Sequence, residues 1–403
     1  MTVISDKAKI DSLLKRRVVE VVIEDELRKK LLSGKKLRIK LGADPTSPDL
    51  HLGHAVPLKK LKEFQDLGHQ IVLIIGDYTA MVGDPSGKSK TRPMLTAEQC
   101  RDNAKTYIEQ VGRILDKDKL EIHANSEWFA KMGFSDVIAL TSNFTVARMI
   151  ERDDFAKRLE EGTDIHLHEL LYPAMQAYDS IMIDADVEIG GSDQRFNILA
   201  GRDLQRKMGK LEQDCMFLGP TLVGTDGVKK MSKSLGNYVG LTDSPEQMVG
   251  KIMSIPDAIL WDWFFLTTEL PEAEINAMRA ACDKGEMNPR DAKMRLAKEI
   301  ISSFHSPDAA AAAEDHFDKV FKNKETPDEV PEVKLDAGEY PLIDVLMAAK
   351  MVASKSEARR VIGEGGVKVG GETEKDANAK LKVEKKPLLI QKGKRHFVNV
   401  VSK

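Results

Sequence analysis

The spacing of apolar residues near the N-terminus changes twice within a short stretch. Residues 37–41 and 70–75 are short runs of apolar and β-branched residues, and each run leads into a glycine. Between them, the apolar positions of 52–67 recur at the spacing of an amphipathic helix. A strand, a helix and a second strand in this order predict a parallel βαβ unit. Further short apolar runs predict strands at 187–189 and 221–223.

Beyond residue 243 the pattern changes to helices. Ser244 and Gln247 form a capping box around Pro245, and Asn288 precedes a second helical pattern that also begins with proline. The stretch 323–331, rich in Lys, Glu, Asp and Pro, is typical of a linker. We therefore expect four segments in chain order: an α/β part at 1–240, an α-helical part at 241–322, a linker at 323–335 and a small α+β part at 336–403.

The composition predicts a multidomain, soluble protein. A chain of 403 residues, 42% of them hydrophobic, exceeds the size at which one core stops growing. No run approaches the roughly 18 apolar residues of a membrane span, and the first residues lack the apolar core of a secretory signal. We therefore expect a cytoplasmic protein. Cys100, Cys215 and Cys282 are far apart and form no CxxC pair, which argues against a disulfide framework or a structural zinc site.

The net charge is unevenly distributed. Residues 334–403 contain 15 Lys and Arg against 9 Asp and Glu, so the −3 of the whole chain leaves −9 for the first 333 residues. A basic tail on an acidic body is typical of a protein whose tail contacts a phosphate backbone. The alternative is a lysine-rich surface that serves solubility.

Two short strings carry the candidate chemistry: HLGH at 51–54 and KMSKS at 230–234. The first lies where a strand is followed by a helix, which is where open α/β sheets bind ligands and where a helix start favours anions. Glycine leaves room for a triphosphate, and a loop with two lysines can close over its far end. We interpret the two strings as one phosphate clamp. Taken singly, the histidines can be a helix-capping pair and the lysines a surface hairpin.

The flanks of these strings resemble class I aminoacyl-tRNA synthetases. GADPT at 42–46 precedes the first string, and GGSDQ at 190–194 precedes the second. Within that class, the run YPAMQAYD at 172–179 is similar to the bacterial tyrosyl-tRNA synthetases. The resemblance extends over nearly the whole chain, from about residue 35 to the end.

This resemblance implies a Rossmann-like, doubly wound parallel-sheet catalytic domain at 1–240, with a dimer-forming insertion at about 125–186. It also implies that 241–322 is an α-helical tRNA-binding domain and that 336–403 is an S4-type RNA-binding domain. The implied activity is ATP-dependent activation of L-tyrosine with release of pyrophosphate, followed by transfer of tyrosine to the 3′-terminal adenosine of tRNA(Tyr). The implied partners are tyrosine, ATP, tRNA(Tyr) and a second copy of the chain, without a membrane.

The resemblance also assigns roles to residues. The implied catalytic residues are His51, His54, Lys230, Lys233, Lys88 and Arg92. The implied ATP-binding residues are Asp44, Thr46, Gly53, Gly191, Asp193, Met231, Ser232 and Ser234. The implied tyrosine-binding residues are Asp84, Tyr172, Gln176, Asp179, Gln194 and Asn125. The implied RNA-binding residues are Lys355, Arg359, Arg360 and Lys368.

The implied chemistry needs no enzyme nucleophile, because charge builds on the phosphoryl oxygens and the departing pyrophosphate. Positioning and electrostatic stabilisation are sufficient. We expect Mg²⁺ to accompany ATP, and no metal ligated by the protein itself: the acidic and histidine side chains at 164–169 lack residues that complete a tetrahedral set.

Asp179 is expected to accept the phenol hydroxyl of tyrosine. Many members of the family place a second, hydroxyl-binding tyrosine four residues before the aspartate of GADPT, where this chain has Lys40. The second hydroxyl contact is therefore open, and Lys40 can instead pair with a carboxylate.

Two other functions remain open from the sequence. A tryptophan-specific relative is disfavoured because Asp179 would face an indole, which has a donor but no hydroxyl. An RNA-binding regulator with the same fold has no need of a pyrophosphate clamp, so the intact histidines and lysines argue against it. Exchange of pyrophosphate into ATP with each amino acid discriminates the three functions.

Overall fold

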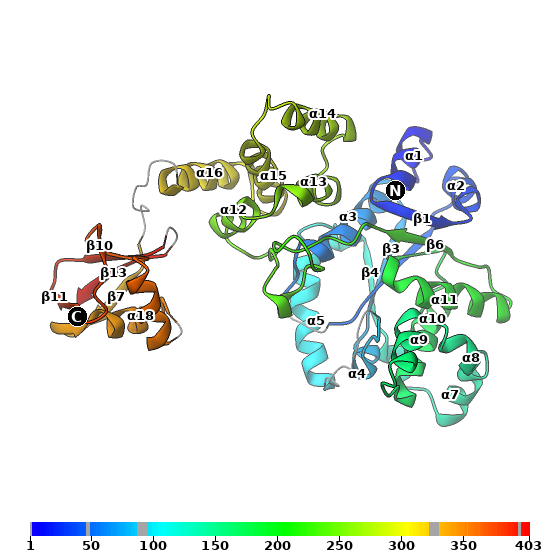
Figure 1. Ribbon diagram of the computed structural model, residues 1–403. Helices are drawn as coiled ribbons and strands as arrows, with labels where there is room; N and C mark the ends of the chain where they lie inside the picture. The colour runs from blue at the N-terminus through cyan, green and yellow to red at the C-terminus, as the bar shows by residue number, and fades with distance from the viewer. Residues whose placement is uncertain (1, 46–48, 87–95, 322–329, 353, 394–395) are drawn as a thin grey trace. The chain divides into compact units, whose positions relative to one another are not determined.

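The predicted βαβ unit is confirmed. Strand β2 (Arg38–Ala43), helix α3 (Leu52–Asp66) and strand β3 (Gln70–Ile75) follow one another, and β2 and β3 are parallel. The register pairs Arg38 with Gln70 and Ala43 with Ile75, so the two strands end at the same edge of the sheet. Because His51 is the N-cap residue of α3, the first string lies at this edge (Figure 1).

The computed structural model describes residues 2–45, 49–86, 96–321, 330–352, 354–393 and 396–403. Contacts divide the chain into two compact units, residues 1–306 and residues 307–403. Thr46, Lys88 and Arg92, and most of the predicted linker, lie outside the described residues. Among the described residues, no helix combines the length and the apolar character needed to cross a membrane.

Unit 1 is built on a six-stranded sheet with the order β1 (Val18–Val22), β6 (Asp214–Leu218), β5 (Val187–Gly191), β2, β3 and β4 (Leu120–Ala124). Five strands are parallel, and β1 joins β6 in the antiparallel direction. Chain order runs outward from β2 through β3 to β4 and then returns to β5 on the other side of β2. The sheet is thus a doubly wound, Rossmann-like sheet, as predicted, with its switch point between β2 and β5.

The prediction of a strand at 221–223 is wrong. The sixth strand of the sheet is β6, and of residues 221–223 only Val223 pairs, in an isolated bridge with Lys230. Every residue of β6 is buried. Pro220 lies between β6 and residues 221–223, and it has no N–H group to donate to a neighbouring strand. In this loop segment only Leu222 is buried, and its carbonyl accepts a hydrogen bond from the Met231 amide of the second string at 3.0 Å.

Helices lie on both faces of the sheet. Val72 and Ile74 of β3 share a core with helices α10 and α11, and alternation along the strand turns its other side chains toward α3. The helices before residue 240 are α1 (Lys7–Lys15), α2 (Glu24–Leu32), α3, α4 (Thr79–Val82), α5 (Ala97–Val111), α6 (Ser126–Phe129), α7 (Phe134–Thr141), α8 (Val146–Met149), α9 (Asp153–Glu160), α10 (Tyr172–Met182) and α11 (Arg195–Lys207).

The predicted change to helices after residue 243 is confirmed. Ser244 caps α12 in a capping box with Gln247, and Asn288 caps α15. Trp263 and Phe264 are fully buried, as expected for core residues of this part. The helices here are α12 (Pro245–Met253), α13 (Leu260–Thr267), α14 (Glu272–Asp283) and α15 (Pro289–Phe304).

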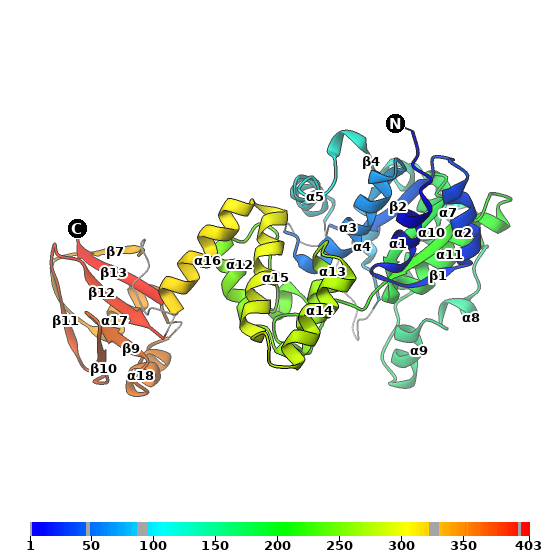
Figure 2. The same cartoon turned by 90° about the horizontal axis from the view of Figure 1, so that it is seen from above.

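Unit 2 has its own core, formed by helices α17 and α18 against two small sheets (Figure 2). Residues 332–335, expected in the linker, instead form β7, which pairs in parallel with β13. The elements are α16 (Pro307–Phe321), β7 (Glu332–Leu335), β8 (Gly338–Pro341), α17 (Leu342–Ala348), α18 (Lys355–Gly363), β9 (Val367–Val369), β10 (Glu372–Glu374), β11 (Lys380–Val383), β12 (Leu388–Lys392) and β13 (His396–Ser402).

Candidate active site

The histidine string caps α3. The Nδ1 atom of His51 accepts a hydrogen bond from the Gly53 amide at 3.1 Å, and Nδ1 of His54 accepts one from the His51 amide at 3.2 Å. The capping-pair interpretation is therefore correct as local structure. It does not exclude a ligand role, because each cap uses Nδ1 only and leaves Nε2 available to face a substrate.

The lysine loop, residues 224–237, is held by one side chain. Asn237 accepts a hydrogen bond from the Ser232 amide at 2.8 Å and donates one to Asp226 at 2.8 Å. Met231 is buried, with 2% of its surface exposed, and the hydroxyls of Ser232 and Ser234 lie 3.0 Å apart. The loop is thus a preformed hairpin whose buried methionine fixes the position of the lysines on either side.

The two strings lie together in space, as the phosphate-clamp interpretation requires. The chain that leaves the lysine loop runs past the start of α3: His51 pairs with Gly240 in an isolated bridge, and the Leu52 amide donates to the Val239 carbonyl at 3.0 Å. A side chain at Gly53 would place its Cβ 2.9 Å from Cε1 of His51 and 3.9 Å from Cβ of Met231. Glycine is therefore required here by the His51 ring itself.

Both histidines are neutral at physiological pH. Burial, together with the charges of His54, Lys233 and Lys230, lowers the pKa of His51 to about 3. Burial and the two lysines lower the pKa of His54 to about 4. Because each Nδ1 accepts a backbone N–H, the proton of each neutral ring is on Nε2. The string presents two Nε2–H donors, which suit phosphate oxygens.

Each of the two lysines of the lysine loop contacts a carboxylate. Lys230 donates to Asp193 at 2.8 Å, and Lys233 donates to Asp49 at 2.9 Å. Asp193 follows β5 in a short 3₁₀ turn, and a Cβ on Gly191 would lie 2.5 Å from its Oδ1. The residues expected to bind ATP, Thr46 aside because it lies outside the described part of the chain, thus gather near the switch point, between the ends of β2 and β5.

Asp179 lies on α10 and is buried. Its Oδ1 accepts the indole N–H of Trp128 at 2.9 Å, and its Oδ2 accepts the amide of Asn125 at 3.3 Å. Burial raises the pKa of Asp179 to about 7, against the opposing effects of Lys40 and of these two donors. A carboxylate has more lone pairs than these two bonds use, so it can accept one further donor.

Tyr172, on the same helix, donates its hydroxyl to Asp44 at 2.9 Å, and Thr79 donates to the other oxygen of Asp44 at 2.8 Å. Burial, followed by the charges of Asp44 and Asp84 and a smaller effect of Asp179, raises the pKa of Tyr172 well above its usual range. These carboxylates therefore all lie near the Tyr172 side chain. Asp44 was expected at the nucleotide, and here it also orients a tyrosine-pocket residue.

Asp84 is held by hydrogen bonds of its own. It accepts the amide of Gln194 at 2.7 Å and the backbone N–H of Ser86 at 2.9 Å. The guanidinium of Arg152 lies 3.9 Å from Asp84 and donates to Ser86 at 2.8 Å. Gln176 donates to Glu188 at 3.0 Å. All six residues expected to bind tyrosine lie in one network or beside it, although their roles stay predictions.

Several residues of this network were not expected from the sequence: Thr79, Trp128, Arg152, Ser180 and Gln213. Trp128 gave one usable signal, since a buried indole N–H needs an acceptor and Asn125 was already a candidate three residues earlier. Arg152 gave none, because a single arginine in a charged insertion has no distinguishing pattern.

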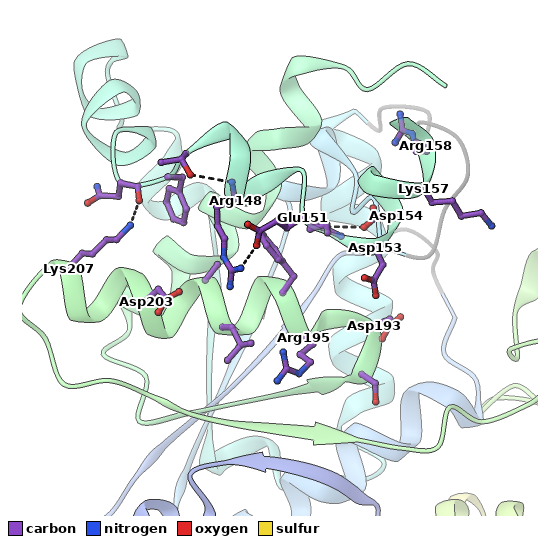
Figure 3. Close-up of a pocket in the computed structure, with 18 of the residues that line it drawn as sticks. Arg148, Glu151, Asp153, Asp154, Lys157, Arg158, Asp193, Arg195, Asp203 and Lys207 are labelled. Carbon is purple, nitrogen blue, oxygen red and sulfur yellow. Dashed lines mark hydrogen bonds and ion pairs between the residues drawn. The ribbon is translucent and has the colours of Figure 1, made fainter. Parts of the chain in front are cut away.

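A cavity of about 970 Å³ lies between the insertion and α11, and adjoins the candidate site at Arg152, Ser192 and Asp193 (Figure 3). Most of its charged side chains are already in ion pairs, such as Arg148 with Glu151 and Arg152 with Asp154. The two strings, and not this cavity, therefore remain the candidate for phosphate binding.

Among the described residues, no group of three or more His, Cys, Asp and Glu side chains is arranged to hold a metal ion. The four RNA-binding candidates are exposed on α18 and β9 of unit 2. Lys355 pairs with Asp344 at 2.8 Å and Arg360 with Glu364 at 3.1 Å.

Two family models match the chain over adjoining segments. The model described as tRNA synthetases class I (W and Y) matches residues 32–322, and the model described as tyrosine–tRNA ligase SYY-like C-terminal domain matches residues 323–400.

Curated relatives match over nearly the full length. The tyrosine–tRNA ligase of Carboxydothermus hydrogenoformans is 51% identical over 398 residues, which are 96% of this chain and 97% of the relative. That of Aquifex aeolicus is 50% identical over 390 residues, 97% of this chain and 98% of the relative.

Solved structures show the same fold at lower identity. A tyrosyl-tRNA synthetase from Archaeoglobus fulgidus, complexed with L-tyrosine, is 24% identical with a TM-score of 0.62, over 76% of this chain and 99% of that one. A truncated mitochondrial tyrosyl-tRNA synthetase from Aspergillus nidulans is 23% identical with a TM-score of 0.64, over 78% of this chain and 95% of that one. On the evidence of the family models and the close relatives, the chain belongs to the tyrosine–tRNA ligases among the class I tRNA synthetases.

Proposed function

We infer that this protein activates L-tyrosine with ATP, releases pyrophosphate, and transfers the tyrosyl group to the 3′-terminal adenosine of tRNA(Tyr). The observation that carries the inference is the meeting of two neutral histidines and two lysines at the switch point of the sheet, in the same unit as a buried group of carboxylates that includes Asp179. The family relationship agrees with this inference.

In the first step the carboxylate of tyrosine attacks the α-phosphorus of ATP, and the bond to the β-phosphate oxygen breaks. Negative charge grows on the departing pyrophosphate. We propose that the Nε2–H donors of His51 and His54 and the ammonium groups of Lys230 and Lys233 stabilise that charge. Lys88 and Arg92, outside the described residues, are proposed to assist. Each donor contributes on the order of 3 kcal/mol to the transition state.

The carboxylates beside Lys230 and Lys233 have a consequence for ATP binding. Asp193 and Asp49 hold the two lysines before the triphosphate arrives. We propose that the phosphates take over the lysines on binding, which releases Asp193 to accept the ribose hydroxyls. Lysine suits this exchange because it is a point charge on a flexible stem.

Tyrosine is proposed to place its phenol at Asp179 and its ammonium near Asp84, Tyr172 and Gln176. Phenylalanine would leave Asp179 buried without its third donor, which is costly. Discrimination of roughly 10⁵ against phenylalanine is known for a tyrosine-specific enzyme of this same kind, whose site hydrogen-bonds the substrate hydroxyl.

We further propose that Mg²⁺ arrives with the triphosphate, neutralising part of its charge, and that the enzyme works in the cytoplasm, where its tRNA is. A homodimer through the insertion is also proposed. Phe134 and Ile138 of α7 are 81% and 55% exposed, and such an apolar face favours association. Sedimentation of the intact protein and of Phe134→Asp tests it: a monomer in both would remove the proposal.

The proposed activity is tested by exchange of labelled pyrophosphate into ATP with tyrosine, phenylalanine or tryptophan. We expect exchange with tyrosine, and none above background with the other two at equal concentration. Exchange with tryptophan alone would reassign the pocket, and no exchange with any amino acid would favour an RNA-binding regulator.

A further inference from the structure

Lys40 is one of the largest fully buried side chains of the protein. It extends from β2 toward α10, where its Nζ lies 3.0 Å from Oε1 of Glu188, 2.8 Å from the carbonyl oxygen of Gln176 and 2.8 Å from Oγ of Ser180. An ammonium group has three N–H donors, and these three acceptors use all of them. The lysine is therefore fully satisfied without water.

Glu188, on the neighbouring strand β5, completes the cluster. It is 1% exposed and accepts hydrogen bonds from Gln176 at 3.0 Å, from Ser180 at 3.0 Å and from Gln213 at 2.6 Å. Gln176 is thus held twice, its backbone carbonyl by Lys40 and its side-chain amide by Glu188. Both contacts fix the turn of α10 that carries the expected tyrosine-binding residues.

The same ammonium acts on the adjacent carboxylate. Asp179 precedes Ser180 on α10, and the charge of Lys40 lowers the pKa of Asp179, while burial and the charge of Glu188 raise it. The other charged groups nearby are the carboxylates of Asp44 and Asp84, both of which act on Tyr172, and the guanidinium of Arg152, which lies 3.9 Å from Asp84. Of the causes that lower the pKa of Asp179, the positive charge of Lys40 is the largest.

We propose that Lys40, paired with Glu188, is a positioning residue that determines specificity for the phenol: it holds Gln176 in place and keeps a positive charge behind Asp179. The proposal rests on the tyrosine site inferred above. Stability alone does not explain the pair, because a buried ion pair is often no more stabilising than apolar side chains of similar size. A purely structural pair would leave tyrosine recognition unchanged when replaced without unfolding.

The test uses the full-length protein with Lys40→Met, which keeps the length of the stem and removes the charge. Lys60→Met is the matched control, because Lys60 is also 0% exposed, bonds to Glu63 and to the Leu13 carbonyl, and lies outside the tyrosine pocket. Pyrophosphate exchange gives KM for tyrosine, KM for ATP, kcat and the ratio of tyrosine to phenylalanine activity across a range of pH.

For Lys40→Met we expect KM for tyrosine to rise about tenfold, KM for ATP to change less than about twofold, and phenylalanine discrimination to fall. Asp179 must be ionised to accept the phenol, and removing the cation raises its pKa. The acid limb of kcat/KM for tyrosine should therefore move to higher pH by about one unit. For Lys60→Met, KM for tyrosine, KM for ATP, phenylalanine discrimination and the acid limb should equal those of the unsubstituted protein.

If Lys40→Met fails to fold because Glu188 is left as an unpaired charge, the double variant Lys40→Met/Glu188→Gln is used. The effect of Lys40 on Asp179 is larger than that of Glu188, so the double variant should still show the same direction of change. The proposal alone would be overturned if a folded single or double variant kept the unsubstituted KM for tyrosine, phenylalanine discrimination and acid limb of kcat/KM. Absence of tyrosine-dependent exchange in the unsubstituted protein would overturn both this proposal and the proposed function.

Discussion

At the scale of single residues, the site depends on one hydrogen bond per histidine. The backbone N–H groups at the start of α3 can only donate, so they fix Nδ1 of His51 and His54 as acceptors. Burial and the lysine charges keep both rings neutral. The capping bonds that make these residues look structural therefore set the tautomer that a phosphate-binding role needs.

His51→Asn separates the two roles of this side chain. Asparagine is a good N-cap and replaces the Nδ1 acceptor, but it has no group at the position of Nε2. We expect kcat/KM for ATP in pyrophosphate exchange to fall about 100-fold. His51→Ala also removes the cap, so its free energy of unfolding, measured by urea denaturation, should be about 1 kcal/mol lower than that of His51→Asn. Full activity of folded His51→Asn would contradict the assigned role.

The sequence indicated which residue types form the site but not their contacts. His51, Lys230 and Asp179 were identifiable because their motifs are short and local. The partners of Lys40 were not, because Glu188 lies on another strand and Ser180 on α10, and only the parallel pairing of β2 with β5 places Glu188 beside Lys40. The expectation that Lys40 can pair with a carboxylate is confirmed, but the identity of Glu188 needed the fold.

At the scale of elements, β2, α3, β3, β5, α12 and α15 could be predicted because their apolar periods and caps are local. The sixth strand was misplaced, since Asp214–Leu218 is a fully buried run with no alternation, and a neighbouring apolar run competed with it. The antiparallel β1 depends on pairing with β6, far along the chain, which no local pattern reveals.

We expect the order of the lysine loop to matter for the proposed catalysis. Asn237→Ala should loosen the hairpin, because Asn237 holds the Ser232 amide and Asp226. We expect kcat for exchange to fall about tenfold while KM for tyrosine stays within about twofold. Asn288→Ala is the matched control: it removes the cap of α15, lowers stability by about 1 kcal/mol and should leave kcat unchanged. Equal kcat values for both variants would show that loop order is irrelevant.

At the scale of the whole molecule, the uneven charge does not follow the boundary between the two units, because residues 307–333 of unit 2 contain 3 Lys and no Arg against 8 Asp and Glu. The basic part is residues 334–403, which include helices α17 and α18 and most of the two small sheets. The domain limits expected from composition stay predictions, except that residues 332–335 are strand β7 rather than linker.

The RNA role of unit 2 is tested by Arg359→Ala/Lys368→Ala, two exposed cations on α18 and β9. We expect tRNA charging to weaken and its dependence on salt to become shallower, by up to about one unit of slope per lost phosphate contact. Tyrosine-dependent pyrophosphate exchange should not change. Lys380→Ala/Lys382→Ala on β11 carries the same charge change and is the control. If both pairs alter charging equally, net charge and not a defined surface is responsible.

The central claim is that segments far apart in the chain act on one triphosphate. A double-mutant cycle of His51→Asn and Lys233→Met, measured as kcat/KM for ATP in tyrosine-dependent exchange, tests it most directly. Because the charge of Lys233 acts on His51 in the structure, we predict a coupling free energy of about 1 kcal/mol or more. Effects that add to within about 0.3 kcal/mol would mean that the two strings act independently, and would contradict the claim.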